Sequence, residues 1–240
     1  MPPRKGSRHT GRRPPTFSRE IKIIYEDDAV VAVDKPPGLA AVPIEGAHSP
    51  SAWAILAEEM KRLKQRCFVV HRIDRFTSGV LLFAKTNAAR DVLVRQFLKH
   101  TPVRQYLAVV RGRLAEKEGK LVDHLRKAGM FQKMSREGDP EAARAELLYS
   151  LERPLRDASL VRVRLVTGLQ NQIRVQFAAA GHPVIGDRKY RAEEASERRI
   201  ARVALHAVRL EFQHPVTRET VAIDSPLPAD MRSLIESLSR

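Results

Sequence analysis

The sequence predicts an α+β fold, built on a largely antiparallel, mixed sheet with flanking helices. Short alternating or fully apolar runs, which are typical of strands, come in groups, and amphipathic helical stretches stand irregularly between them. The regular alternation of strand and helix that predicts a doubly wound parallel sheet does not occur. A chain of 240 residues, 43% of them apolar, can bury a sizeable core without disulfides or metal.

The N-terminal half predicts strands and two helices. A helix over 49–65 has Ser51 as a plausible N-cap and apolar residues at spacings of three and four. A second helix over 87–100 has Asn87 as its expected N-cap. Five apolar or alternating runs are expected to form strands: 21–26, 29–35, 67–74, 79–86 and 103–114.

The C-terminal half predicts more strands and a closing helix. Residues 115–140 are polar and weakly patterned, and no element is expected there. Residues 167–182 fit either a strand or a helix, and we favour a helix because Gly181 provides a natural stop. Pro228 lies near the start of the final helix, 228–240. The remaining strands are expected at 142–152, 159–167, 203–215 and 219–228.

Positive charge is concentrated at the N-terminus. Residues 1–19 hold six Lys or Arg, four Pro and no acid, which predicts a disordered basic arm followed by one domain over 20–240. The body still carries 37 basic against 28 acidic residues, within a total net charge of +15. Such an excess favours a polyanionic partner, and nucleic acid fits better than a membrane surface because no basic amphipathic anchor stands out.

Several classes of chemistry lack their motifs. The sequence has no GxxxxGK[ST] or GxGxxG loop for nucleotide cofactors. Its only cysteine, Cys67, fits a core residue, and the eight histidines show no paired ligand spacing. No apolar run is long enough to span a membrane, and the N-terminus lacks an apolar signal-peptide core. We therefore expect a cytoplasmic protein without a cofactor or a metal.

The stretch HRIDRFTSG, residues 71–79, places one carboxylate among cations between two apolar runs. A polar turn between strands is one interpretation, with Asp74 and Thr77 binding the local backbone and Gly79 relieving strain. The other is an active-site loop. The motif resembles the HRLDRxTSG motif of the RluA-type pseudouridine synthases, and the catalytic aspartate of that family falls on Asp74.

Four further blocks of the chain resemble the same family in the same order. Residues 26–43 are similar to its NKPxG segment, and 205–231 to its C-terminal block. VRQYLAVVRG (103–112) resembles the segment of the active-site tyrosine, which falls on Tyr106. NQIRVQFAAAGHPVIGDRKY (171–190) is similar to the block of its active-site arginine, which falls on Arg174. The resemblance spans roughly residues 21–232 and implies a pseudouridine synthase-like catalytic domain.

One block departs from the pattern. The family usually reads TGRxHQIR, whereas residues 167–174 read TGLQNQIR, so that Leu169 replaces an arginine and Asn171 a histidine. These positions are expected to touch RNA or to frame the pocket. The departure bears more on the choice of substrate than on the chemistry, because Arg174 is retained.

The resemblance implies isomerisation of uridine to pseudouridine, which needs no redox cofactor. One carboxylate, Asp74, suffices to attack C1′ or to take the C2′ proton, whereas a sugar hydrolase normally uses two carboxylates. A bidentate ion pair from Arg174 would keep Asp74 charged and aimed. Tyr106 offers a flat face for uracil and a hydroxyl that could relay the C5 proton. The substrate-binding residues are expected to be Arg72, which would fill the gap left by the flipped uridine, with His71, Arg75, Thr77 and Gln172.

The expected partner is RNA, either ribosomal or transfer RNA, and neither DNA nor a membrane. The leading interpretation is a monomeric RNA pseudouridine synthase. The alternative is a catalytically inactive RNA- or ribosome-binding protein on the same scaffold, with activity lost through positions 169 and 171. The sequence favours the enzyme, because the positions of the aspartate, the tyrosine and the arginine are all filled.

Overall fold

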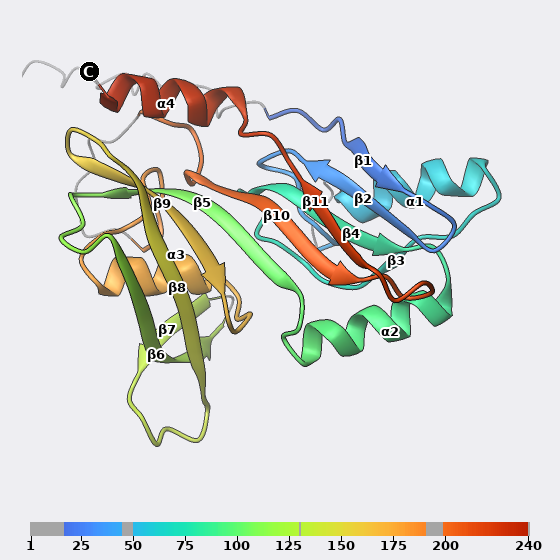
Figure 1. Ribbon diagram of the computed structural model, residues 1–240, viewed down its shortest axis with the longest axis horizontal. Helices are drawn as coiled ribbons and strands as arrows, with labels where there is room; N and C mark the ends of the chain where they lie inside the picture. Colours follow the sequence, from blue (N-terminus) through green and yellow to red (C-terminus); the bar gives the residue numbers. More distant parts are fainter. Residues whose placement is uncertain (1–16, 45–49, 130, 191–198, 240) are drawn as a thin grey trace, which may run out of the picture.

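The computed structural model describes residues 17–44, 50–129, 131–190 and 199–239 (Figure 1). The predicted basic arm, 1–19, therefore lies almost entirely outside the described residues. Phe17, within that predicted arm, packs edge-on against Phe76 with ring centroids 5.9 Å apart. None of the described helices is long and apolar enough to cross a membrane.

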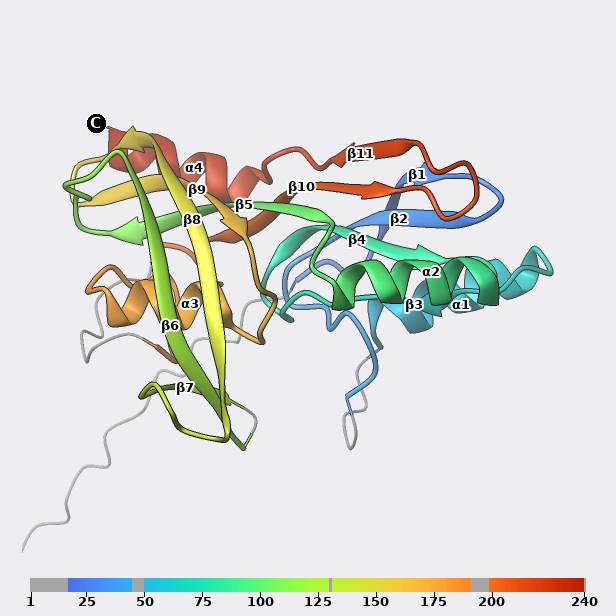
Figure 2. The ribbon, with the colours of Figure 1, turned by 60° about the horizontal axis from the view of Figure 1, so that its bottom comes forward.

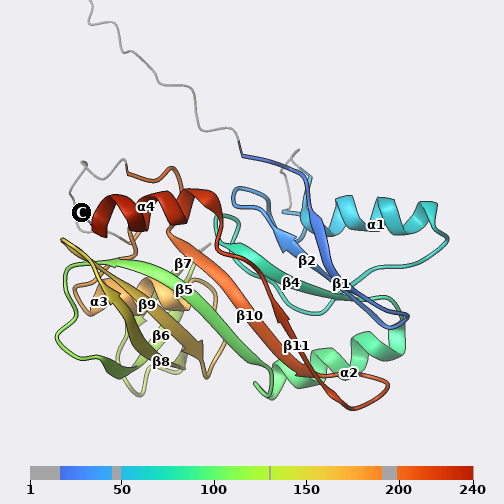
Figure 3. The same cartoon turned by 45° about the horizontal axis from the view of Figure 1, so that its top comes forward.

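The predicted α+β architecture is confirmed. The described strands form one 11-stranded sheet in the order β1-β2-β4-β10-β5-β9-β8-β6-β7, with β11 on β10 and β3 on β4. The strands are β1 (Lys22–Glu26), β2 (Val30–Lys35), β3 (Phe68–Val69), β4 (Ser78–Ala84), β5 (Val103–Arg111), β6 (Glu118–Ala128), β7 (Phe131–Ser135), β8 (Ala142–Pro154), β9 (Ala158–Leu165), β10 (Leu205–Gln213) and β11 (Thr220–Asp224). Figure 3 shows β10 running between β5 and β11 through the middle of the sheet.

The sheet is antiparallel except where β4 meets β10. These two strands pair in parallel at two positions, Ser78 with His206 and Gly79 with Ala207. Gly79 has a φ of 112°, and a Cβ there would lie 2.2 Å from the carbonyl oxygen of Ala207. The motif 71–79 therefore ends in glycine because the two backbones approach too closely for any side chain.

In the part of the chain that the structure describes, four helices flank the sheet: α1 (Ala52–Arg62), α2 (Asn87–Leu98), α3 (Gln172–Ala179) and α4 (Ala229–Ser239). Ser51 caps α1 as predicted, since its side chain accepts a hydrogen bond from the backbone of Ala54. The cap of α2 is Thr86 and not Asn87, because the hydroxyl of Thr86 accepts from the backbone of Ala89. Residues 172–179 form the favoured helix, and Gly181 follows with a φ of 84°.

The central strand β4 is buried on both faces. Leu81 and Phe83 pack in one cluster with Leu56 of α1. Leu82 packs in another cluster with Leu93 of α2. A third and larger core joins β5, β9 and β10 to α3 and α4. The strand that leaves the motif 71–79 is therefore held rigidly from both sides.

The structure corrects the expectation for residues 115–140. This segment contains β6 and β7, and β6 pairs with β8 along nine residues, from Glu118 to Arg126. In Figure 2, β6 and β8 extend together away from the rest of the sheet, with β7 near their far end. Most β6 residues are exposed or half-buried, so this strand shows little of the hydrophobic alternation on which strand prediction depends.

Candidate active site

The motif 71–79 forms the loop from β3 into the start of β4. This loop lies against a second loop, residues 36–43, which follows β2 and is rich in proline and glycine. Arg75 and Gly38 exchange two hydrogen bonds: the Nε of Arg75 donates to the carbonyl of Gly38 at 2.8 Å, and the amide of Gly38 donates back to the carbonyl of Arg75 at 2.9 Å. The buried ammonium of Lys35 donates to the carbonyls of Pro36, Leu39 and Arg75. These contacts fix the backbone of Arg75, directly after Asp74.

His71 anchors the same loop to the sheet. Its Nε2 accepts a hydrogen bond from the backbone amide of Leu82 at 3.0 Å, so the ring proton of the neutral form sits on Nδ1. The ring stacks on Phe97 with centroids 4.4 Å apart and an interplanar angle of 9°. Burial lowers the pKa of His71 to about 3, helped by the positive charge of Arg104. His71 is therefore neutral at physiological pH.

Asp74 and Arg174 meet across the chain, as predicted, but their pairing is not bidentate. The Nη1 of Arg174 donates to Oδ2 of Asp74 at 3.2 Å. The bidentate partner is Asp187, whose two carboxylate oxygens accept from Nε at 2.6 Å and from Nη2 at 2.9 Å. Asp187 is fully buried and Arg174 is 9% exposed, whereas Asp74 keeps 21% of its side chain exposed. The more exposed carboxylate is thus the one free to meet a substrate.

Asn171 also binds the guanidinium of Arg174. Its Oδ1 accepts from Nη1 at 2.7 Å, and its Nδ2 donates to the hydroxyl of Tyr190 at 3.2 Å. Asn171 precedes α3 with a φ of 55°, in the left-handed region that asparagine tolerates better than most residues. The departure at this position therefore supports the arginine directly. Leu169, the other departure, packs against a small apolar cluster that includes Leu125 and Val175.

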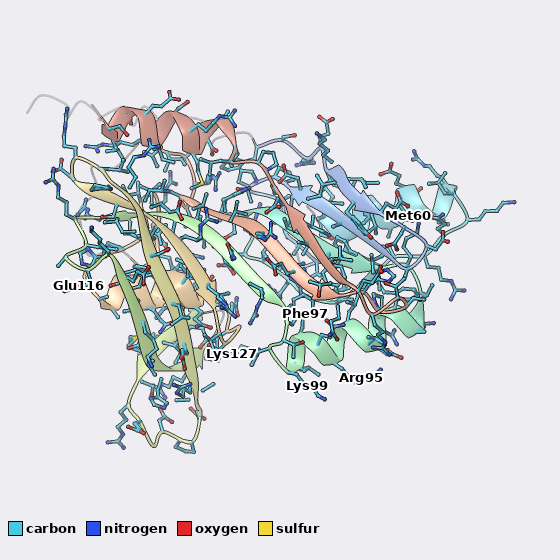
Figure 4. All side chains as sticks on the ribbon, viewed as in Figure 1. Met60, Arg95, Phe97, Lys99, Glu116 and Lys127 are labelled. Atoms are coloured by element: carbon cyan, nitrogen blue, oxygen red, sulfur yellow. The ribbon has the colours of Figure 1, made fainter. Side chains whose placement is uncertain are left out.

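Tyr106 of β5 lies in the same cavity as Asp74 and Arg174. The cavity has a volume of about 590 Å³, a size typical of small-molecule sites. Burial raises the pKa of Tyr106 to about 12, and the negative charge of Asp74 adds to the increase. The hydroxyl therefore stays protonated at neutral pH. Phe97, near the C-terminal end of α2 (Figure 4), also lines the cavity.

The structure brings most of the predicted substrate-binding residues to this cavity. Arg72, His71, Thr77 and Gln172 line it, and Arg72 is exposed. Gln172 is buried and donates to Gln176 and to the carbonyl of Glu146, which holds the start of α3 in place. Arg75 is not among the cavity-lining residues, and its guanidinium lies toward Gly38 and the ring of Phe76.

Two contributors to the site were not identified from the sequence. Asp187 lies in the GDRKY segment, 186–190. This segment belongs to the same block as Arg174, and an acid so placed is the signal by which Asp187 could have been identified. Lys35 falls at the end of the predicted strand 29–35, and the sequence analysis assigns it no role at the site. A lysine at the end of an apolar strand carries no sequence signal that distinguishes it from a solvated one.

The fold of the chain is that of known pseudouridylate synthase domains. The human RNA pseudouridylate synthase domain-containing protein 4 superposes with a TM-score of 0.78 at 20% identity, covering 90% of this chain and 92% of that one. This likeness concerns the architecture alone. The fold and the site together define an α+β protein with a cavity lined by both polar and apolar side chains.

Sequence comparison gives the family. The profile described as RNA pseudouridylate synthase matches residues 29–179. The chain is 34% identical over 230 residues to the ribosomal large subunit pseudouridine synthase D of Zymomonas mobilis, covering 91% of this chain and 73% of that protein. It is also 34% identical over 229 residues to the synthase C of Pasteurella multocida, covering 91% and 68%. The chain belongs to the RNA pseudouridine synthase family, which confirms the resemblance seen in its motifs.

Proposed function

We propose that this enzyme converts uridine to pseudouridine in ribosomal RNA, with Asp74 as the reacting group. The observation that carries the proposal is the position of Asp74, a partly exposed carboxylate that lines the cavity with Tyr106 and accepts a hydrogen bond from Arg174. The relatives named as large-subunit ribosomal synthases favour ribosomal over transfer RNA as the substrate.

Isomerisation breaks the C1′–N1 bond of uridine and forms a C1′–C5 bond, with no net change of redox state. Asp74 can attack C1′, or it can remove the C2′ proton to give a glycal. In either case the freed uracil turns within the cavity and C5 bonds to C1′. If Asp74 has attacked C1′, this step breaks the bond between Asp74 and C1′; if a glycal has formed, C2′ regains its proton. The proton on C5 is then lost while N1 gains one. Water must be kept from C1′ meanwhile, and the cavity walls together with the bound RNA are proposed to do this.

Arg174 is proposed to hold the carboxylate of Asp74 in place. Because Asp187 holds Nε and Nη2, the remaining nitrogen Nη1 points to Asp74 in a fixed direction. A charge-assisted hydrogen bond of this kind is stronger than one between neutral groups, so it fixes the direction of the carboxylate. The same geometry leaves the second oxygen of Asp74 available for the sugar.

Tyr106 is proposed to contact the uracil and to relay the C5 proton. With a pKa of about 12 the phenol is protonated at neutral pH, so it cannot begin as a base. It can pass a proton through its hydroxyl, releasing one as it accepts another. Arg72, exposed at the cavity, is proposed to fill the space that the flipped uridine leaves in the RNA.

We further propose that residues 20–240 form one catalytic domain and that the enzyme acts as a cytoplasmic monomer. One sheet runs through all the described strands, and this continuity supports the single domain. The +9 surplus of charge in this part of the chain suits an RNA substrate better than a neutral ligand.

The test is to map pseudouridines in ribosomal and transfer RNA from cells with and without this gene. We expect at least one site in large-subunit ribosomal RNA to be lost, and to be restored when purified protein is added to the unmodified RNA. Sites lost only from transfer RNA would correct the substrate. Unchanged maps, with RNA binding retained, would support the inactive RNA-binding alternative.

A further inference from the structure

Arg104 is a buried cation in the wall of the cavity that the proposed chemistry does not use. It lies on β5 two residues before Tyr106, so both side chains project from the same face of the strand. Its side chain lines the same cavity, although the residue is only 9% exposed. Burial lowers the pKa of the guanidinium and Tyr106 opposes the shift, whereas no carboxylate of the described residues contributes to it.

The hydrogen bonds of Arg104 within the described part of the chain are few and long. Its Nη2 donates to the carbonyls of Val166 and Thr167 at 3.4 and 3.3 Å, beyond the usual range of about 2.7–3.2 Å. Its Nε is buried and finds no acceptor among the described residues. A buried charged donor without an acceptor is costly, so this cation is incompletely satisfied in the free protein.

The loop before α3 is shaped around the guanidinium. A Cβ at Gly168 would lie 2.3 Å from Nη1 of Arg104, so that any side chain there would displace the arginine. Gly168 also lines the cavity. Glycine at this position therefore keeps the charged group at the cavity wall while leaving room beside it.

An anion that enters with the substrate would satisfy this cation best, because hydrogen bonds between charged groups are the strongest. Uracil and ribose are neutral, so phosphates are the only charged groups that RNA brings to the cavity. Residues two apart on a strand lie about 6.6 Å from each other, which is comparable to the separation of a base from the phosphate of its own nucleotide. A guanidinium fork also suits two oxygens of one phosphate.

We propose that Arg104 binds a backbone phosphate next to the target uridine while Tyr106 contacts the base. This inference rests on the proposed function, because it assigns the phosphate to the same flipped nucleotide. Arg104 is then a positioning residue, which fixes how far the nucleotide enters the cavity relative to Asp74. Its own desolvation is compensated only when RNA is bound.

The test compares Arg104→Met with Arg164→Met. Arg164 is exposed on β9 and pairs with Gln105, so it lies on the opposite face of the sheet from Arg104 and provides a matched control.

The substrate is large-subunit ribosomal RNA isolated from cells that lack the gene. For Arg104→Met we expect KM to rise about 10- to 100-fold, with kcat changed much less. The slope of log affinity against log salt should fall by about 0.7–0.9. Arg164→Met should leave both quantities near the wild-type values.

Two readouts separate this role from a purely structural one. Removal of an unpaired buried cation should leave Tm unchanged or raise it, whereas loss of a structural arginine would lower it. Ethylation of single phosphates in the RNA should reveal one position beside the target uridine that blocks the wild type. The same ethylation should have little further effect on Arg104→Met. Arg104→Lys, which keeps the charge but loses the fork, should keep the salt slope and show an intermediate KM.

The possible failures are distinguishable. An active wild type whose Arg104→Met variant has normal KM and an unchanged salt slope would overturn the phosphate role alone. A variant that fails to fold, or has a much lower Tm with normal KM, would assign Arg104 to the fold instead. If the wild type forms no pseudouridine, the proposed function fails, and the salt dependence of RNA binding still decides whether Arg104 meets a phosphate.

Discussion

Arg174 is bound by both carboxylate oxygens of Asp187, through Nε at 2.6 Å and Nη2 at 2.9 Å. The same Asp187 accepts hydrogen bonds from the backbone amides of Lys189 and Tyr190. The carboxylate therefore ties the start of α3 to the loop that follows the helix. The site contains two aspartates around one arginine, of which one is buried and structural and the other is partly exposed.

Asp187→Asn should damage both stability and turnover. The asparagine cannot accept from both arms of the guanidinium, and breaking a buried ion pair costs about 3–5 kcal/mol. We expect a loss near the lower end of this range, because Asp74 and Asn171 still accept hydrogen bonds from Nη1 of Arg174. Urea unfolding and turnover measure the two effects. Asp224→Asn, which breaks an exposed pair with Arg209, is the control and should cost less than about 1 kcal/mol. Equal losses in both variants would contradict the proposed division of roles.

Asp74→Asn should abolish isomerisation and leave folding nearly intact. The amide oxygen can still accept from Arg174, but it can act neither as a nucleophile nor as a base. Loss of such a group costs at least about 100-fold. Pseudouridine formation in unmodified ribosomal RNA is the measurement, with Asp91→Asn on the exposed face of α2 as the control. Residual turnover above about one per cent of wild type would rule out the assigned role.

Tyr106→Phe should keep substrate affinity and slow the reaction. The ring remains available to the uracil, while the hydroxyl proposed to relay the C5 proton is gone. Positioned proton transfer contributes about 10²- to 10⁴-fold, so kcat should fall within that range while KM stays constant. Tyr149→Phe on β8, whose ring packs against Phe177, serves as the control for general effects on the core. A Tyr106→Phe enzyme as fast as wild type would leave only the ring with a function.

Much of this architecture could be predicted from local sequence, and the exceptions have physical reasons. Ser51 begins a helix because its hydroxyl reaches a free backbone amide, a purely local effect. At the next helix Thr86 and Asn87 are both able to cap, and only the backbone geometry selects Thr86. The long β6 was missed because its pairing with β8, not its own pattern, makes it a strand.

The candidate site shows the same limit. The sequence indicated that Asp74 and Arg174 would meet, and it also suggested a bidentate geometry, which the structure assigns to Asp187 instead. Which of two carboxylates takes both arms of an arginine depends on burial and on loop geometry. Neither property is local to the residues. Arg104 illustrates this further, since only the three-dimensional structure shows that no described carboxylate pairs with it.

Because of Lys35, the free energy of unfolding should increase as the pH rises above 7. Burial lowers its pKa to about 7, although the charge of Asp74 opposes the shift, while the unfolded chain has the ordinary value of about 10.5. Between these values the unfolded state binds more protons, so stability rises with pH, by up to about 1.4 kcal/mol per unit. The Lys35→Met variant has no amine to titrate, so its free energy of unfolding should lack the increase with pH that Lys35 causes. Urea unfolding of both proteins at pH 7, 8 and 9 is the measurement, and parallel curves would show that Lys35 keeps an ordinary pKa.

The basic N-terminal segment should contribute to RNA affinity and not to turnover. Because Phe17 packs against Phe76, the deletion should end at residue 16, which removes five Lys or Arg and no acid. Each phosphate that the segment neutralises adds about 0.7–0.9 to the salt slope of binding. We expect the slope of log affinity against log salt to fall by roughly 2–4 units, since not every charge engages at once.

A second variant separates charge from length. Replacing the five cations of residues 1–16 by glutamine should lower the salt slope as much as the deletion does, because the counterions released by RNA follow the charge and not the chain. Turnover at saturating RNA should stay near wild type in both variants, since Asp74, Tyr106 and Arg174 all lie far beyond residue 16. Parallel lines for all three proteins would mean that the segment does not touch RNA, and a large loss of saturated turnover would mean that part of the active site lies within it.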